Sequence, residues 1–93
     1  MKVYISGPIS NNPNYREQFS KAERRLRESG MHCFNPAKFD PNPDNTWTDY
    51  MRADISELLS YRAIYLLKGW RRSKGARLEL KIAKALDYLI LHE

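Results

Sequence analysis

Short apolar runs alternate along this chain with longer stretches in which apolar residues recur every three or four positions. The short runs lie at Lys2–Ser6, Met31–Phe34, Ala63–Leu67 and Tyr88–Leu91. Their length and their β-branched and aromatic side chains predict buried strands. The longer stretches between them predict helices. Strands that alternate with helices indicate a parallel sheet covered by helices on both faces.

The first helix is expected after the polar loop that follows Gly7-Pro8. Asn12 can cap this helix, with Pro13 at its first position, and Ser29-Gly30 ends it. Its apolar stripe consists of Tyr15, Phe19, Ala22 and Leu26.

Two more helices are expected further along the chain. Thr46 and Asp49 have the form of a capping box, which predicts a helix from Thr46 to about Tyr61. The proline-containing segment 37–45 before it predicts a loop. The last helix is expected from about Lys74 to Leu86. No linker is long enough to separate domains, so we expect one domain over residues 1–93.

Composition narrows the class of protein. No apolar run reaches the length of a membrane span, and the first residues read as a strand rather than a signal peptide. The single Cys33 excludes an internal disulfide and fits a reducing cytoplasm. The two histidines, His32 and His92, do not have the spacing of a zinc site, and we expect neither a metal nor a cofactor. Because a core this small is marginally stable alone, we also expect a homo-oligomer.

The net charge of +5 indicates an anionic partner. One basic group most simply forms the solvated face of the first helix: Lys21, Arg24, Arg25 and Arg27. A second group crowds the loop and helix start before Glu79: Arg71, Arg72, Lys74 and Arg77. No RNA-binding aromatic signature, zinc-finger spacing or helix-turn-helix pattern accompanies them, so a nucleic-acid partner is not favoured.

Glu79 is the most informative residue. It follows the strand at Ala63–Leu67 and shares a helical face with Ala83 and Leu86. In open parallel sheets, ligands bind just outside the carboxyl ends of the strands, where this carboxylate is expected. An ordinary first-turn glutamate, favoured by the helix dipole, is the alternative interpretation. In either case the dipole should keep Glu79 ionised.

A second carboxylate, Asp54, interrupts an apolar helical stripe. The stripe comprises Trp47, Met51, Asp54 and Leu58. In apolar surroundings the pKa of Asp54 should be raised, and the group could donate a proton near neutral pH. Two carboxylates with separated pKa values form the acid and nucleophile pair used on glycosidic bonds. The alternative is a stripe-edge aspartate paired with Arg52 or Arg62.

Polar groups are expected near both carboxylates. Tyr4 points to the sheet face opposite its neighbours in the strand, where its hydroxyl could orient a carboxylate, although a core role is the commoner one. Ser6, Gly7 and Ser10 form a small polar loop in which glycine allows close approach to a ligand. Ser73 adds a hydroxyl and helix-start amides for an anion.

Three segments together resemble the nucleoside 2-deoxyribosyltransferase superfamily. They are Val3-Tyr4-Ile5-Ser6-Gly7-Pro8-Ile9, Trp47-x-x-Tyr50-Met51-x-x-Asp54-Ile55 and Gly69-Trp70-x-x-Ser73-x-Gly75-Ala76-x-x-Glu79. The likeness covers nearly the whole chain and is greatest to the small phage and bacterial members called the DUF4406 group. It implies a flavodoxin-like or Rossmann-like three-layer α/β sandwich. We expect a four-stranded parallel sheet in the order 2-1-3-4.

The resemblance also implies an activity: cleavage of the N-glycosidic bond of deoxyribonucleosides or their 5′-monophosphates. Glu79 then matches the nucleophile, Asp54 the acid near the base, and Tyr4 the tyrosine that orients the nucleophile. Ser73 matches the serine that contacts the 5′-phosphate in the nucleotide-hydrolysing branch. The remaining residues expected at the substrate are Ser6, Gly7, Pro8, Ile9, Ser10, Gly75 and Trp47.

The chain also departs from that branch. Ser10 stands where the branch carries an arginine, and Arg71 or Arg72 is a candidate to supply the charge. The sequence does not continue into the segment with which larger members complete a neighbour's active site. A module that binds nucleotides without turnover is therefore the second hypothesis, and a nucleic-acid-associated protein is the third.

Exposed aromatic residues bear on the assembly. Trp47, Tyr50 and Trp70 are more aromatic surface than so small a domain readily buries, which favours a homodimer or larger assembly. The alternative is that these side chains wall the pocket.

Overall fold

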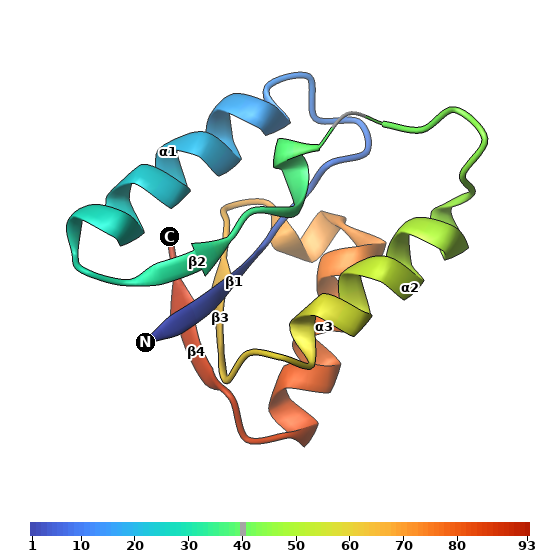
Figure 1. Ribbon diagram of the computed structural model, residues 1–93. Coiled ribbons are helices and arrows are strands. Elements are labelled where there is room, and N and C mark those ends of the chain that lie inside the picture. Colours follow the sequence, from blue (N-terminus) through green and yellow to red (C-terminus); the bar gives the residue numbers. More distant parts are fainter. Residues whose placement is uncertain (40) are drawn as a thin grey trace.

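The computed structural model describes residues 1–39 and 41–93 and contains one four-stranded sheet (Figure 1). The strands are β1 (Lys2–Ser6), β2 (His32–Phe34), β3 (Ala63–Leu66) and β4 (Leu89–His92). They lie in the order β2-β1-β3-β4, and every neighbouring pair is parallel. The predicted sheet and its order are therefore confirmed.

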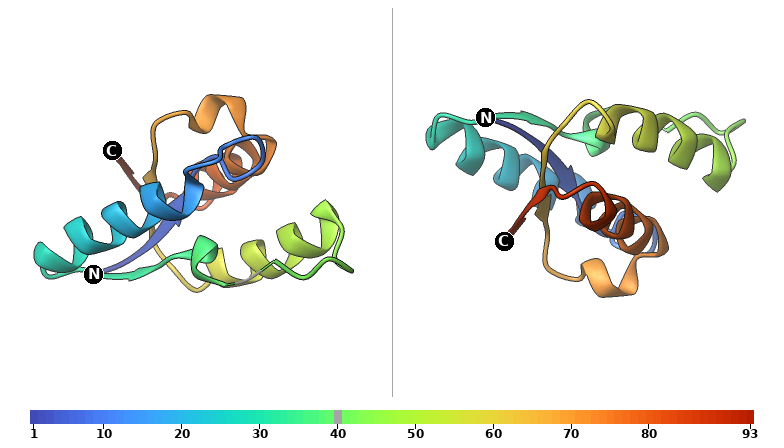
Figure 2. Two further views of the ribbon diagram at one scale, coloured as in Figure 1. Left: turned by 90° about the horizontal axis from the view of Figure 1, so that it is seen from above. Right: turned by 90° about the horizontal axis from the view of Figure 1, so that it is seen from below.

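Three α-helices cover the two faces of the sheet. In Figure 1, α1 (Tyr15–Glu28) lies on one side, whereas α2 (Trp47–Leu58) and α3 (Lys74–Ala85) lie on the other. Figure 2 shows α3 toward β4 and α2 toward β2. The connections into the three helices gather at the edge where β1 and β3 end (Figure 1). Within the described residues, no helix is long and apolar enough to cross a membrane.

Successive side chains of the central strands point to opposite faces of the sheet, so each face has its own hydrophobic core. Tyr4 points to the face opposite Val3 and Ile5, as predicted. Val3 and Ile5 face α1, and Tyr4 faces α2 and α3. The core on the α1 side contains Val3, Ile5, Phe19, Ala22, Leu26, Ala37, Ala63, Tyr65 and Leu67. The core on the other side contains Tyr4, Leu58, Ile64, Leu66, Leu80 and Ala83.

The predicted cap of the first helix is wrong. The residue before α1 is Asn14, and its side chain makes no capping hydrogen bond. Asn12 instead donates its side-chain amide to the Pro8 carbonyl and to Gln18 Oε1, each at 2.9 Å. The Asn12 side-chain oxygen accepts from the Asn14 amide at 3.3 Å, so Asn12 caps the turn that precedes α1 rather than α1 itself.

The other helix ends agree more closely with the sequence. Thr46 and Asp49 form both bonds of the capping box that starts α2. This helix ends at Leu58, earlier than expected, and the loop before it contains a 3₁₀ turn, η1 (Pro36–Lys38). A second 3₁₀ turn, η2 (Trp70–Arg72), precedes α3.

Candidate active site

Glu79 is held at the carboxyl edge of the sheet by two residues of β1. Its side chain lies in the second turn of α3 and is only 5% exposed. The Tyr4 hydroxyl donates to Oε2 at 2.5 Å, and the Ser6 hydroxyl donates to Oε1 at 2.6 Å. Both carboxylate oxygens therefore have a fixed orientation, and Glu79 is not the surface residue of the alternative interpretation.

The pKa of Glu79 is higher than the helix dipole alone predicts. Burial raises the pKa of Glu79 to about 7, although the hydrogen bonds from Ser6 and Tyr4 favour the ionised form. The helix dipole acts mainly within the first turn, and Glu79 lies one turn further along. Desolvation of the carboxylate is therefore the dominant effect.

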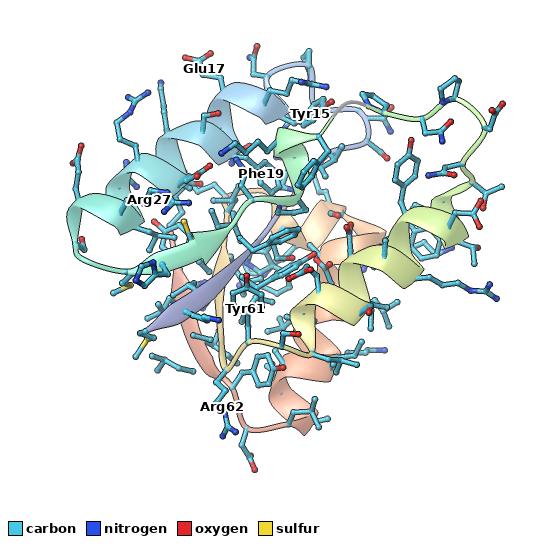
Figure 3. The ribbon with its side chains drawn as sticks, viewed as in Figure 1. Tyr15, Glu17, Phe19, Arg27, Tyr61 and Arg62 are labelled. Atoms are coloured by element: carbon cyan, nitrogen blue, oxygen red, sulfur yellow. The ribbon has the colours of Figure 1, made fainter. Side chains whose placement is uncertain are left out.

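Asp54 behaves as the apolar stripe predicted. It is half-buried on α2, and burial raises its pKa to about 6. The negative charge of Asp54 in turn raises the pKa of Glu79, so the two carboxyl groups interact. Among the described residues, no salt bridge joins Asp54 to Arg52 or Arg62. Figure 3 shows Arg62 at the opposite end of the sheet from the loops that precede the helices.

Tyr4 is both a core residue and a hydrogen-bond donor. Its ring stacks on Phe34 at 5.7 Å between centroids and contacts Tyr61 edge-on at 6.2 Å. Burial, and next the charge of Glu79, raise the pKa of Tyr4 well above its ordinary value. The hydroxyl consequently keeps its proton and continues to donate to Glu79.

A cleft of about 510 Å³ opens above Glu79. Ten of the eleven predicted site residues line it: Tyr4, Ser6, Gly7, Ile9, Ser10, Trp47, Asp54, Ser73, Gly75 and Glu79. The exception is Pro8, which is not among the lining residues. Pro8 Cγ instead lies 3.3 Å from the position that a Cβ would take at Gly69, so Pro8 packs the loop before α1 against the loop after β3.

The two predicted glycines serve packing as well as the cleft. A Cβ at Gly7 would lie 2.7 Å from Leu67 Cβ, and a Cβ at Gly75 would lie 3.0 Å from Met51 Sδ. The first distance reflects the close approach of the chain after β1 and β3, and the second the approach of α2 and α3. Gly7 therefore has a packing role that the sequence analysis did not predict.

Ser73 begins α3 at the side of the cleft. Its hydroxyl oxygen accepts a hydrogen bond from the Ala76 amide at 3.1 Å and so caps the helix. The hydroxyl proton remains available for donation, because an oxygen that accepts from the capping amide still carries its O–H group. Ser73 can therefore cap the helix and donate to an anion in the cleft together.

Sequence reasoning missed several residues of the cleft wall. Tyr15 and Phe19 were assigned only to the apolar stripe of α1, but both reach the cleft. Figure 3 shows their rings directed inward, whereas Glu17 on the same helix points away. Their position in the first turns of α1, next to the carboxyl edge of the sheet, could have identified them as cleft residues. Other lining residues that the sequence analysis did not place at the site are Asn11, Pro36, Ala37, Phe39, Pro41, Met51, Lys74 and Ala76.

The chain leads from the central strand β1 to β2 on one side of the sheet, and from the central strand β3 to β4 on the other side. The buried Glu79 carboxylate lies at the carboxyl ends of β1 and β3. This arrangement defines a Rossmann-like α/β protein with its candidate site at the topological switch point. Within that class, the family described as a domain of unknown function (DUF4406) matches residues 1–92, and the chain belongs to it.

The chain is also similar to a solved structure, that of a 2-deoxyribosyltransferase from the psychrotolerant bacterium Bacillus psychrosaccharolyticus. That enzyme is characterised as a biocatalyst for the industrial synthesis of antiviral and antitumoral nucleosides. The TM-score is 0.74 at 19% sequence identity, over 99% of this chain and 71% of that chain. The similarity shows a shared fold. No curated protein sequence matches the chain.

Proposed function

We propose that this protein cleaves the N-glycosidic bond of deoxyribonucleosides or their 5′-monophosphates, with Glu79 as the nucleophile. The observation that carries this proposal is the buried Glu79 carboxylate, held through both oxygens by the Tyr4 and Ser6 hydroxyls beneath an open cleft. A fixed carboxylate can attack an anomeric carbon without first losing rotational freedom. The fold shared with a 2-deoxyribosyltransferase supports the same chemistry.

The proposed reaction has two steps. A Glu79 oxygen bonds to C1′ of the sugar while the C1′–N bond breaks, and the departing base takes a proton from the Asp54 carboxyl group. Water then attacks C1′ and gives its proton to Asp54, and the C1′–O bond to Glu79 breaks. A second base in place of water would give transfer instead of hydrolysis. The first step needs Glu79 ionised and Asp54 protonated.

The charge at the rim of the cleft supports a phosphorylated substrate. Arg72 and Lys74 line the cleft on either side of Ser73. Within the described residues, neither cation forms a salt bridge with a carboxylate. Their charge is therefore available to a 5′-phosphate, for which the Ser73 hydroxyl is a further donor.

The test is incubation with a panel of deoxyribonucleosides and 5′-monophosphates, followed by chromatography of the released base. Glu79→Gln keeps the shape of the side chain and should lower the rate roughly 10³-fold or more, because the nucleophile is lost. Asp54→Asn should cost less for bases that leave easily, because their departure depends less on protonation.

The matched control is Glu17→Gln, on the exposed side of α1. It should release base at the wild-type rate. Release at that rate by Glu79→Gln would contradict the proposal. A thermal shift by nucleotides without base release by the wild-type protein would support the non-catalytic binding module instead.

A further inference from the structure

A cation covers an aromatic ring at the rim of the cleft. The Lys74 ammonium lies over the Trp47 ring, 4.1 Å from its centroid. Trp47 is the first residue of α2 and Lys74 the first residue of α3, and both line the cleft. The contact therefore joins the starting ends of the two helices that flank the site.

This contact is more exposed than the groups proposed to react. Lys74 is exposed and Trp47 is 39% exposed, whereas Glu79, which lines the same cleft, is 5% exposed. Where α2 and α3 approach behind the contact, a Cβ at Gly75 would meet Met51 Sδ at 3.0 Å. The helices are thus already closely packed at that point, and a substrate that occupies this part of the cleft meets the lysine side chain.

Displacing the lysine has a cost that depends on the substrate. An exposed cation–π contact changes an equilibrium by about two- to fivefold. An unphosphorylated nucleoside offers the ammonium only a neutral hydroxyl oxygen in exchange for the ring. A phosphate near Ser73 offers it a charge-assisted hydrogen bond, which corresponds to about tenfold or more in affinity.

We propose that Lys74 selects phosphorylated over unphosphorylated substrates by exchanging the Trp47 ring for the substrate phosphate. The inference rests on the proposed function, because it assumes that nucleosides and nucleotides enter this cleft. It names 5′-monophosphates as the preferred substrate class. It also assigns to Trp47 a role that needs no contact with the reacting atoms: it holds the ammonium when phosphate is absent.

The test compares a deoxyribonucleoside and its 5′-monophosphate by calorimetric titration in a Glu79→Gln background, where turnover is suppressed. Lys74→Met keeps an apolar stem but removes the charge. It should strengthen binding of the nucleoside about two- to fivefold and weaken binding of the monophosphate about tenfold. Opposite changes for two ligands are not expected from general damage to the fold.

The matched control is Lys81→Met, the same substitution at an exposed position of α3 that does not line the cleft. It should leave both affinities unchanged. Fluorescence gives a second readout: Trp70→Phe leaves Trp47 as the only tryptophan, because the chain has two. Inorganic phosphate should change that fluorescence, and Lys74→Met should abolish the change.

The outcomes separate the two proposals. If both ligands bind and Lys74→Met alters their affinities in parallel or not at all, the selection by Lys74 is wrong and the proposed function stands. If the protein binds neither ligand and releases no base, the proposed function fails, and the selection fails with it.

Discussion

At the scale of single residues, the site is a competition between burial and hydrogen bonding. Two hydroxyls stabilise the Glu79 carboxylate, but burial raises its pKa to about 7, above the value of about 6 at Asp54. The two carboxyl groups therefore compete for one proton, and burial favours Glu79 as its holder. The proposed reaction needs this proton on Asp54 instead.

The first prediction at this scale is a bell-shaped dependence of kcat/KM on pH. Below about pH 6 both groups are protonated and the nucleophile is lost; above about pH 7 both are ionised and the acid is lost. We expect a maximum between these values. Asp54→Asn should remove the alkaline limb, because ionised Glu79 is then the only requirement. A profile that stays flat from pH 5 to 9 would contradict these roles.

At the scale of elements, two pairs of elements approach closely at glycines that line the cleft. Gly7 lets the chain after β1 approach Leu67, and the Leu67 amide donates to the Ser6 carbonyl at 2.9 Å. Gly75 lets α3 approach Met51 on α2. A methyl group added at Gly7 would meet Leu67 Cβ, which is next to the main chain. A methyl group added at Gly75 would meet the flexible thioether of Met51.

The second prediction follows from that difference. Gly7→Ala should lower the free energy of unfolding by about 1–3 kcal/mol, because neither partner can move without shifting the main chain. Gly75→Ala should cost less, since the thioether can rotate and alanine favours the helix by about 1 kcal/mol. Urea denaturation of both variants measures the difference. Equal losses would show that the two contacts are equally rigid.

At the scale of the whole molecule, the sequence was sufficient for what depends on order along the chain. Alternating strands and helices, with the rule for parallel crossovers, predicted the sheet order, and the switch-point rule gathered Tyr4, Asp54 and Glu79 at one edge. The sequence was insufficient for properties that depend on contacts between side chains far apart along the chain. The desolvation that raises the pKa of Glu79 and the Lys74–Trp47 contact are both of that kind. Self-association through Trp47, Tyr50 and Trp70 stays a prediction.

The third prediction concerns the stability of the whole fold. The pKa of Glu79 is raised from 4.5 to about 7 on folding, so folding keeps a proton that the unfolded chain releases between these values. Stability should therefore fall as the pH rises from about 4.5 to about 7, by about 3 kcal/mol at roughly 1.4 kcal/mol per decade. Glu79→Gln should lack this loss.

Urea denaturation from pH 4 to 8 measures the difference between the wild-type protein and Glu79→Gln. Glu17→Gln is again the control, and its curve should run parallel to that of the wild-type protein. A Glu79→Gln curve that is also parallel would show that Glu79 is not desolvated on folding.

The hydrogen bonds that fix Glu79 also bear on how the chain folds. Tyr4 and Glu79 are separated by 75 positions, and Ser6 and Glu79 by 73. Contacts between such distant residues form only after the loops between them have closed, and all-parallel sheets close late and slowly. Until then Glu79 remains in water as an ordinary ionised carboxylate. Folding near neutral pH therefore includes uptake of a proton, and mild acid should hasten refolding, although Glu79 must release that proton again before it can attack a substrate.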